Sequence, residues 1–298
     1  MSYAGPLAAL ATAVCWSANS VFFTLAGRRV GSQTVNIVRL LLALGMMWLM
    51  HVAWSGTLWP LGTGPGPWIW LGLSGFVGFA LGDAVLFEAL VLLGPRLAML
   101  VMTLWPAFAT LMAWAFLGEH LAPRKLAAMA TTLAGIAWVV ADRSGPPDPE
   151  RPRALARGLL FALLGALGQA IGFLFSKFGL QSQIHPVSAN FIRVLAGTLC
   201  LGTWILFRGE FPGIVKHLSD RRALGLIALG ALSGPVVGVV LSLYAQTRAP
   251  LGVASTLMSL APVILLPVSV LVFKERVGSR AVLGTLVALG SASALFLL

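Results

Sequence analysis

The sequence predicts an all-α membrane protein with ten transmembrane helices, arranged as two inverted five-helix repeats around a central cavity. Apolar residues make up 58% of the chain and charged residues only 10%, against about 25% charged residues in a soluble domain. The apolar residues are gathered in runs long enough to cross a bilayer as helices. Several motifs of the first half also recur in the second half, which indicates an internal duplication.

The expected spans divide into two sets of five. They are residues 6–26, 34–54, 67–93, 96–117, 124–142, 158–178, 187–207, 223–246, 249–273 and 280–298. A polar linker at 143–157 separates a first repeat at 1–142 from a second repeat at 158–298. Because five is odd, the second copy must enter the membrane from the opposite side, which makes the repeats inverted.

The charge distribution excludes some functions and suggests an orientation. The net charge of +11 does not indicate nucleic-acid binding, because nearly all Lys and Arg residues lie between the apolar runs, as in membrane proteins. They concentrate in the gaps after odd-numbered spans, which places both termini outside the cytoplasm. Cys15 and Cys200 lie inside apolar runs, so we expect buried thiols and no disulfide. The four histidines are spread among different gaps, and we expect neither a metal site nor a cofactor.

One repeated stretch predicts two distorted helices. The sequence MTLWP at 102–106 recurs 156 residues later as MSLAP at 258–262. A proline inside an apolar run frees the carbonyl four residues earlier and kinks the helix that carries it. We therefore expect helix kinks at Pro106 and Pro262.

A second repeated pair lies near the start of spans two and seven. Asn36 and Arg39 recur 154 residues later as Asn190 and Arg193. Each arginine lies about one turn inside its span, so we expect its guanidinium to snorkel to the lipid headgroups. The alternative is an arginine that points inward and binds a substrate carboxylate through bidentate hydrogen bonds.

Asp83 is the main candidate for a polar site inside the membrane. An unpaired carboxylate at this depth costs on the order of 2.5–3.5 kcal/mol, so its presence needs a reason. On a helical wheel it shares a face with Phe76 and Phe87, and its repeat partner is Val239. We expect Asp83 to bind substrate and to take up a proton during turnover. The alternative is a protonated Asp with a structural role.

Other candidates for substrate binding are amide, hydroxyl, aromatic and methionine side chains within the spans. Trp105 offers a large apolar face with one N–H donor, which suits an aromatic or aliphatic substrate. Core packing is the alternative for this side chain. The full set of candidates is Trp16, Asn19, Ser20, Phe79, Asp83, Phe87, Met102, Trp105, Gln169, Phe173, Tyr244, Met258 and Ser259.

Taken together, these motifs resemble the drug/metabolite transporter superfamily, in its ten-helix EamA-type branch. The residues that carry the resemblance are Trp16, Asn19, Arg39, Gly82, Asp83, Ala89, Leu90, the LWP stretch at 104–106, Glu119, Tyr244, Ala254, Pro262 and Glu275. The LWP stretch is also similar to the YddG-like amino-acid exporters. The resemblance implies alternating access in a bacterial inner membrane and export of small metabolites, with amino acids first and amphipathic drugs second. It also implies termini in the cytoplasm, which differs from the charge count.

The sequence thus predicts a secondary transporter. No glycine-rich phosphate loop ending in Lys-Ser or Lys-Thr is present, so we expect a gradient to supply the energy. The expected partners are an amino acid or related metabolite and membrane lipid, and a monomer is the simplest state. A polytopic membrane enzyme is a weaker alternative, because Asp83 and Glu88 lie on different helix faces and cannot hold a metal together. A channel or lipid scramblase remains a third alternative.

Overall fold

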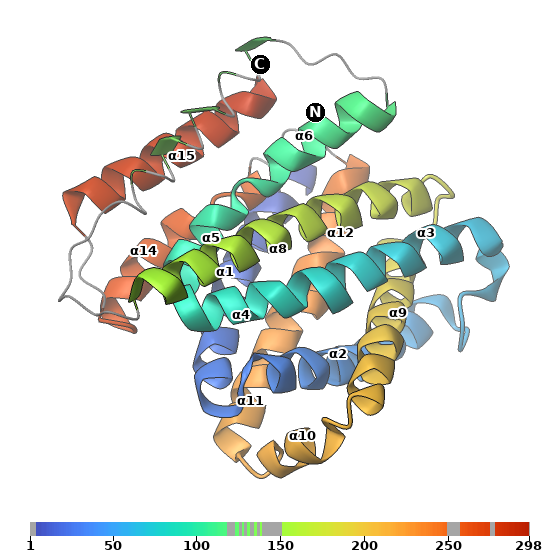
Figure 1. Ribbon diagram of the computed structural model, residues 1–298. Coiled ribbons are helices and arrows are strands. Elements are labelled where there is room, and N and C mark those ends of the chain that lie inside the picture. Colours follow the sequence, from blue (N-terminus) through green and yellow to red (C-terminus); the bar gives the residue numbers. More distant parts are fainter. Residues whose placement is uncertain are drawn as a thin grey trace.

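The computed structural model describes residues 4–117, 151–248, 257–274 and 278–297, together with positions 123–124, 127, 130–131, 134–135 and 138. The described residues form packed helices and no strand (Figure 1). The elements are α1 (Ala4–Val30), α2 (Ser32–Ser55), η1 (Leu61–Thr63), α3 (Pro65–Gly75), η2 (Phe76–Gly82), α4 (Asp83–Leu93), α5 (Pro95–Met102), α6 (Trp105–Leu117), α8 (Arg151–Leu180), α9 (Pro186–Phe207), α10 (Phe211–His217), α11 (Arg221–Ala231), η3 (Leu232–Gly238), α12 (Val239–Arg248), α14 (Ala261–Leu271) and α15 (Ser279–Leu297).

Within the described residues, seven helical stretches are long and apolar enough to cross a membrane. They match the expected spans one to four and six to eight. Helices α14 and α15 lie in expected spans nine and ten, whereas most of span five lies outside the described residues. The total of ten therefore stays a prediction. The linker expected at 143–157 lies outside the described residues up to position 150, and from Arg151 it is already helical in α8.

The two halves carry the same irregularities at the same spacing. Segments η2 and η3 are both π-helical, and their bounds Phe76–Gly82 and Leu232–Gly238 differ by 156 positions at each end. Such π-helical turns are rare and often mark functional sites. Helices α2 and α9 likewise begin 154 positions apart, at Ser32 and Pro186. The structure therefore has the two-repeat architecture that the sequence motifs indicated.

The two prolines start new helices instead of bending continuous ones. Helix α5 ends at Met102, and α6 begins at Trp105 with Pro106 as its second residue. Helix α14 begins in the same way at Ala261, followed by Pro262. A proline in the first turn of a helix costs little, because the N–H that it lacks would have no helical partner there. The expected kinks are thus complete breaks between helices.

Each half packs its third helix against the first two helices of the other half. Helix α3 lies on α8 and α9, and α11 lies on α1 and α2. The end of α1 at Gly27 and the start of α8 at Gly158 both face the end of α4, at Val91 and Leu93 respectively. Helices α1 and α8 therefore reach the same end of α4 with opposite ends of their own.

Glycines allow the closest of these crossings. A Cβ atom added to Gly168 in α8 would lie 2.9 Å from the Cα atom of Gly82, and one added to Gly172 would lie 3.3 Å from the Cα atom of Gly78. Small residues of this kind let the backbones of membrane helices approach each other. At the corresponding crossing of α1 with η3, the Asn19 side chain packs against Gly234.

Polar contacts join the loops at one end of the molecule. The Arg29 guanidinium forms an ion pair of 2.8 Å with Asp220. Gln33 donates a hydrogen bond to Glu210, and the Thr34 hydroxyl lies 3.3 Å from the His217 ring. The loops after expected spans one and seven therefore lie together, as the charge count assumed. Which side of the membrane they face stays a prediction.

Candidate functional site

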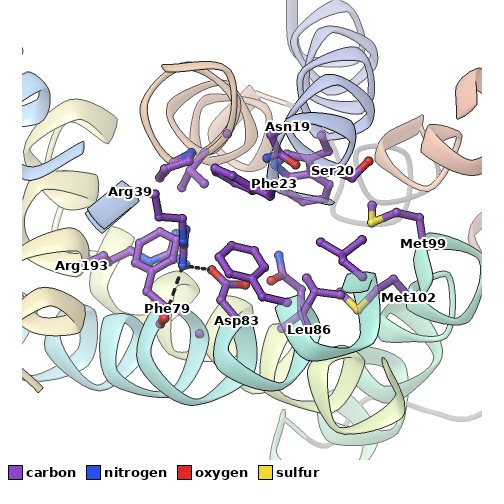
Figure 2. Close-up of a pocket in the computed structure, with 18 of the residues that line it drawn as sticks. Asn19, Ser20, Phe23, Arg39, Phe79, Asp83, Leu86, Met99, Met102 and Arg193 are labelled. Atoms are coloured by element: carbon purple, nitrogen blue, oxygen red, sulfur yellow. Dashed lines mark hydrogen bonds and ion pairs between the residues drawn. The ribbon is translucent and has the colours of Figure 1, made fainter. Parts of the chain in front are cut away.

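A cavity of about 70 Å³ lies between the two repeats. Figure 2 shows Asn19, Ser20 and Phe23 of α1 on one side of it and residues of η2 and α4 on the other. The complete lining is Trp16, Asn19, Ser20, Phe23, Arg39, Gly78, Phe79, Asp83, Leu86, Phe87, Leu90, Met99, Met102, Gln169, Phe173, Arg193, Gly234, Pro235 and Val239. Both repeats contribute to it, and the side chains of Arg39, Asp83 and Arg193 bring three ionisable groups together.

Arg39 and Asp83 form an ion pair at the cavity. The Arg39 Nη2 atom lies 2.5 Å from Asp83 Oδ2, and the side chain of Arg39 is only 2% exposed. The Nε and Nη2 atoms of Arg39 also donate to Asn36 Oδ1, at 3.1 and 2.8 Å. A further hydrogen bond of 3.4 Å reaches the carbonyl of Phe79 in the π-helical segment η2. The guanidinium is thus held from several directions, and Asp83 has the partner that its depth demands.

Arg193, the repeat partner of Arg39, has a different environment. Its Nε and Nη1 atoms are buried and have no hydrogen-bond partner among the described residues. Asn190, the counterpart of Asn36, donates instead to the carbonyl of Pro235 at 2.6 Å. The Arg193 guanidinium carbon lies 5.0 Å from the ring centre of Phe79, which is a cation–π distance. One guanidinium at the cavity is therefore hydrogen-bonded to a carboxylate, and the other is not.

The snorkelling expected for both arginines is wrong. Arg39 is 2% exposed and Arg193 is 3% exposed, and both line the cavity. The depth of an arginine along its helix could not show whether its side chain snorkels to the headgroups or points into the cavity, because the direction of the side chain decides this. The informative signals were the recurrence of the arginine in both halves and the need of Asp83 for a countercharge.

The helical wheel also misplaced one aromatic side chain. Phe76 was expected to share the inward face with Asp83, but it is 38% exposed, whereas Phe79 is 5% exposed and lines the cavity. A wheel assumes α-helical geometry over the whole span. The π-helical segment η2 intervenes, and its wider i→i+5 turns rotate the residues before it relative to those after it.

Aromatic side chains form much of the remaining wall. The rings of Phe23 and Phe87 have centres 5.0 Å apart, and Phe87 also lies 4.6 Å from the Arg39 guanidinium carbon. Trp16 meets Phe173 edge to face at 6.3 Å. The cavity thus combines an apolar aromatic surface with one ion pair and one further cation, a combination suited to an amphipathic ligand.

The structure brings most of the candidate residues to the cavity. Trp105 packs behind Phe173 with ring centres 4.8 Å apart, and Tyr244, Met258 and Ser259 do not line the cavity. The candidates that do line it are Trp16, Asn19, Ser20, Phe79, Asp83, Phe87, Met102, Gln169 and Phe173. Substrate binding by any of the candidates stays a prediction. Phe23, Leu86 and Met99 also line the cavity, and nothing beyond their apolar character marks them in the sequence. Leu90 lines it as well and was expected only as part of the family resemblance.

Three of the residues that carried the family resemblance, Glu119, Ala254 and Glu275, lie outside the described residues. Among the residues that the structure describes, no group of three or more His, Cys, Asp or Glu side chains could hold a metal ion.

The family profile described as "EamA-like transporter family" matches the chain twice, at residues 3–141 and 156–297. The chain belongs to the EamA-like transporter family. It is therefore a multi-pass membrane transporter with a small-molecule substrate, as the resemblance implied.

A solved structure titled "Crystal structure of protein" is similar to the chain at 17% sequence identity, with a TM-score of 0.64. The match covers 100% of this chain and 98% of the other, and it shows that the two share a fold. Comparison with curated proteins gave no match.

Proposed function

We propose that the protein is a secondary transporter that exports small metabolites across a bacterial inner membrane by alternating access, with amino acids as the first candidates. The observation that carries this proposal is the cavity between the repeats, where an ion pair and an unpaired guanidinium meet an aromatic wall. Substrate sites of secondary transporters lie at such repeat interfaces, near the middle of the membrane.

The packing of the helices supports an inverted repeat. Each third helix lies across the first two helices of the other half, and α1 and α8 approach α4 with opposite ends. Two halves related in this way can exchange roles, so that the cavity opens first to one side of the membrane and then to the other.

The size of the cavity supports a moving mechanism. About 70 Å³ holds a few water molecules, whereas ligand pockets measure roughly 300–1,000 Å³. A metabolite enters such a cavity only if the helices around it separate. The end of α5 at its break from α6 and both π-helical segments border the cavity, and they are suitable places for this movement.

The aromatic wall favours one alternative, an exporter of amphipathic drug-like compounds. The rings of Phe23, Phe87 and Phe173 and the thioethers of Met99 and Met102 line the cavity and present an adaptable apolar surface. Competition against a labelled amino acid distinguishes an amino-acid exporter from an exporter of amphipathic compounds. Whichever of the two classes of unlabelled compound reduces transport of the label more strongly is the class of substrate.

A role for Asp83 in proton coupling belongs to the same proposal. If a proton reached Asp83, the ion pair with Arg39 would break, and two guanidinium groups would face the cavity without a countercharge. Proton uptake would then change the charge that a substrate meets. Coupling through Asp83 predicts that a pH difference across the membrane drives transport.

The test is uptake of labelled amino acids by proteoliposomes, with and without a pH difference. Phe173→Ala removes a cavity ring and should reduce flux strongly. Phe178→Ala, on the same helix, removes a ring that packs on Trp70 outside the cavity and should leave flux nearly unchanged. Equal effects of the two substitutions would contradict the proposed site, and uptake that neither saturates nor is competed would indicate a channel.

A further inference from the structure

We infer that the cavity is selective for organic monoanions: Arg193 binds the carboxylate of a substrate whose apolar or aromatic body lies against the phenylalanine wall. This inference rests on the proposed function, because it takes the cavity to be the substrate site. It goes further in two ways. Within the class of small metabolites, it replaces amino acids with organic monoanions of charge −1 as the preferred substrates, and it assigns the residue that recognises this charge.

The balance of charges at the cavity is the first argument. Among the described lining residues, Arg39 and Arg193 are cationic and Asp83 is the single acid. Asp83 is bound to Arg39 at 2.5 Å, so one positive charge remains. A buried charge without a partner is costly. A ligand with one negative charge makes the occupied cavity neutral.

The second argument is the difference between two equivalent arginines. Asn36 and Asp83 accept hydrogen bonds from Arg39, whereas two nitrogen atoms of Arg193 have no partner among the described residues although the side chain is only 3% exposed. A carboxylate can accept two parallel hydrogen bonds from a guanidinium, which a neutral ligand cannot match. Arg193 is therefore the free binding group, and Arg39 positions Asp83.

The third argument is the shape of the site. In Figure 2, Arg193 lies at one end of the cavity and Met99 and Met102 lie toward the other end, with the ring of Phe79 beside the guanidinium. A carboxylate at Arg193 thus directs the rest of a ligand along an apolar wall. An inorganic anion such as chloride would neutralise the charge but would leave this wall without a contact.

A zwitterionic amino acid fits this charge balance less well than the same molecule without its amino group. Its ammonium group would return the net charge of the occupied cavity to +1. The only carboxylate among the described lining residues is that of Asp83, which is already bound to Arg39. Removal of the amino group from an aromatic amino acid should therefore strengthen binding.

A second hollow agrees with an anionic ligand. It measures about 450 Å³ and lies where α8 and α12 end. Its described lining residues include Lys177 and Arg248 and no acidic side chain. Positive side chains in a hollow raise the local concentration of anions.

The experiment measures binding to the purified full chain by titration calorimetry in detergent. The probes are 3-phenylpropionate, its neutral amide 3-phenylpropanamide, phenylalanine and chloride. We expect the propionate to bind about 10- to 100-fold more tightly than the amide, the factor that charge-assisted hydrogen bonds supply, and more tightly than phenylalanine.

Three variants locate the effect. Arg193→Gln should bring the ratio of propionate to amide affinity close to one, while amide binding persists and so reports an intact cavity. Arg193→Lys keeps the charge and should give an intermediate ratio. Arg208→Gln makes the same exchange at an exposed residue just beyond the end of α9 and should leave the ratio unchanged.

Equal affinity of the wild-type protein for the propionate and the amide would overturn the inference without any variant, and so would an unchanged ratio in Arg193→Gln. Chloride that competes fully with the propionate, combined with no gain from the phenyl group, would reduce the site to an inorganic-anion site. Transport of phenylalanine without an anion preference would overturn only this inference. An anion preference without transport of any probe would overturn only the proposed function.

Discussion

Replacement of Gly75 by alanine is the sharpest test of how the repeats meet. A Cβ atom at Gly75 would lie 2.0 Å from the Arg193 carbonyl oxygen and 2.9 Å from the Arg193 Cα atom. Both are backbone atoms of α9, so no side-chain rotation can relieve the clash. The backbone angles of Gly75, φ −67° and ψ −41°, suit alanine, so the whole cost is steric.

The size of the effect follows from this distance. An ordinary contact begins at 3.4 Å, so α9 must move from 2.0 Å to about 3.4 Å, a retreat of about 1.4 Å. Overpacking of this kind costs typically about 1–3 kcal/mol. Because the moving residue is Arg193, the variant should also lose affinity for an anion in the cavity.

The assay is thermal unfolding of the purified protein in detergent, together with anion binding. Gly72→Ala, on the same helix, is the matched control, because a Cβ atom there would meet nothing within 4 Å. The control should be neutral or slightly stabilising, by at most about 1 kcal/mol from helix propensity. If Gly75→Ala were as stable as Gly72→Ala, the close crossing of α3 and α9 would be refuted.

Three other predictions concern charge. Asp83→Asn leaves Arg39 buried without a countercharge, so it should lower the free energy of unfolding by about 3–5 kcal/mol. If Asp83 couples protons to transport, the same substitution should also abolish the pH dependence of transport. Normal transport by this variant from pH 5 to 8 would exclude that coupling. His185 caps α9 by accepting the Val187 N–H at 3.3 Å, and burial lowers its pKa below the ordinary value of about 6.5. The neutral ring is therefore the stable form, so stability should be full above pH 6.5 and fall as the pH drops through the lower folded pKa; His185→Asn keeps the cap and should remove this pH dependence. A reporter that is active only in the cytoplasm, fused to the C-terminus, should stay silent, and an active reporter would reverse the orientation.

The sequence was most informative where its two halves repeat. The offset of 156 between the MTLWP and MSLAP stretches located the helix breaks. It also made Asp83 and Val239 partners, and each of them follows a π-helical segment. Pattern alone could not show that these segments are π-helical, because tertiary packing rather than local propensity decides between α and π turns.

Side-chain direction was the main gap in the prediction of the site. Asp83 was expected to lie at a polar site because of its cost in the membrane, and that physical argument led to the cavity region. Its partner Arg39 was assigned to the headgroups, since an arginine near a helix end can snorkel or point inward with the same sequence pattern. The unequal partners of Arg39 and Arg193 depend on distances across four helices, which no single segment encodes.

The central claim is that the two halves are threaded through the membrane in opposite directions around a shared cavity. Single cysteines at Arg28, in the last turn of α1, and at Gln181, directly after α8, test it most directly in a chain whose Cys15 and Cys200 are replaced by alanine. Both positions are exposed. A membrane-impermeant thiol reagent should label one of them on intact cells and the other only after permeabilisation. Labelling of both from the same side would contradict the inverted repeat.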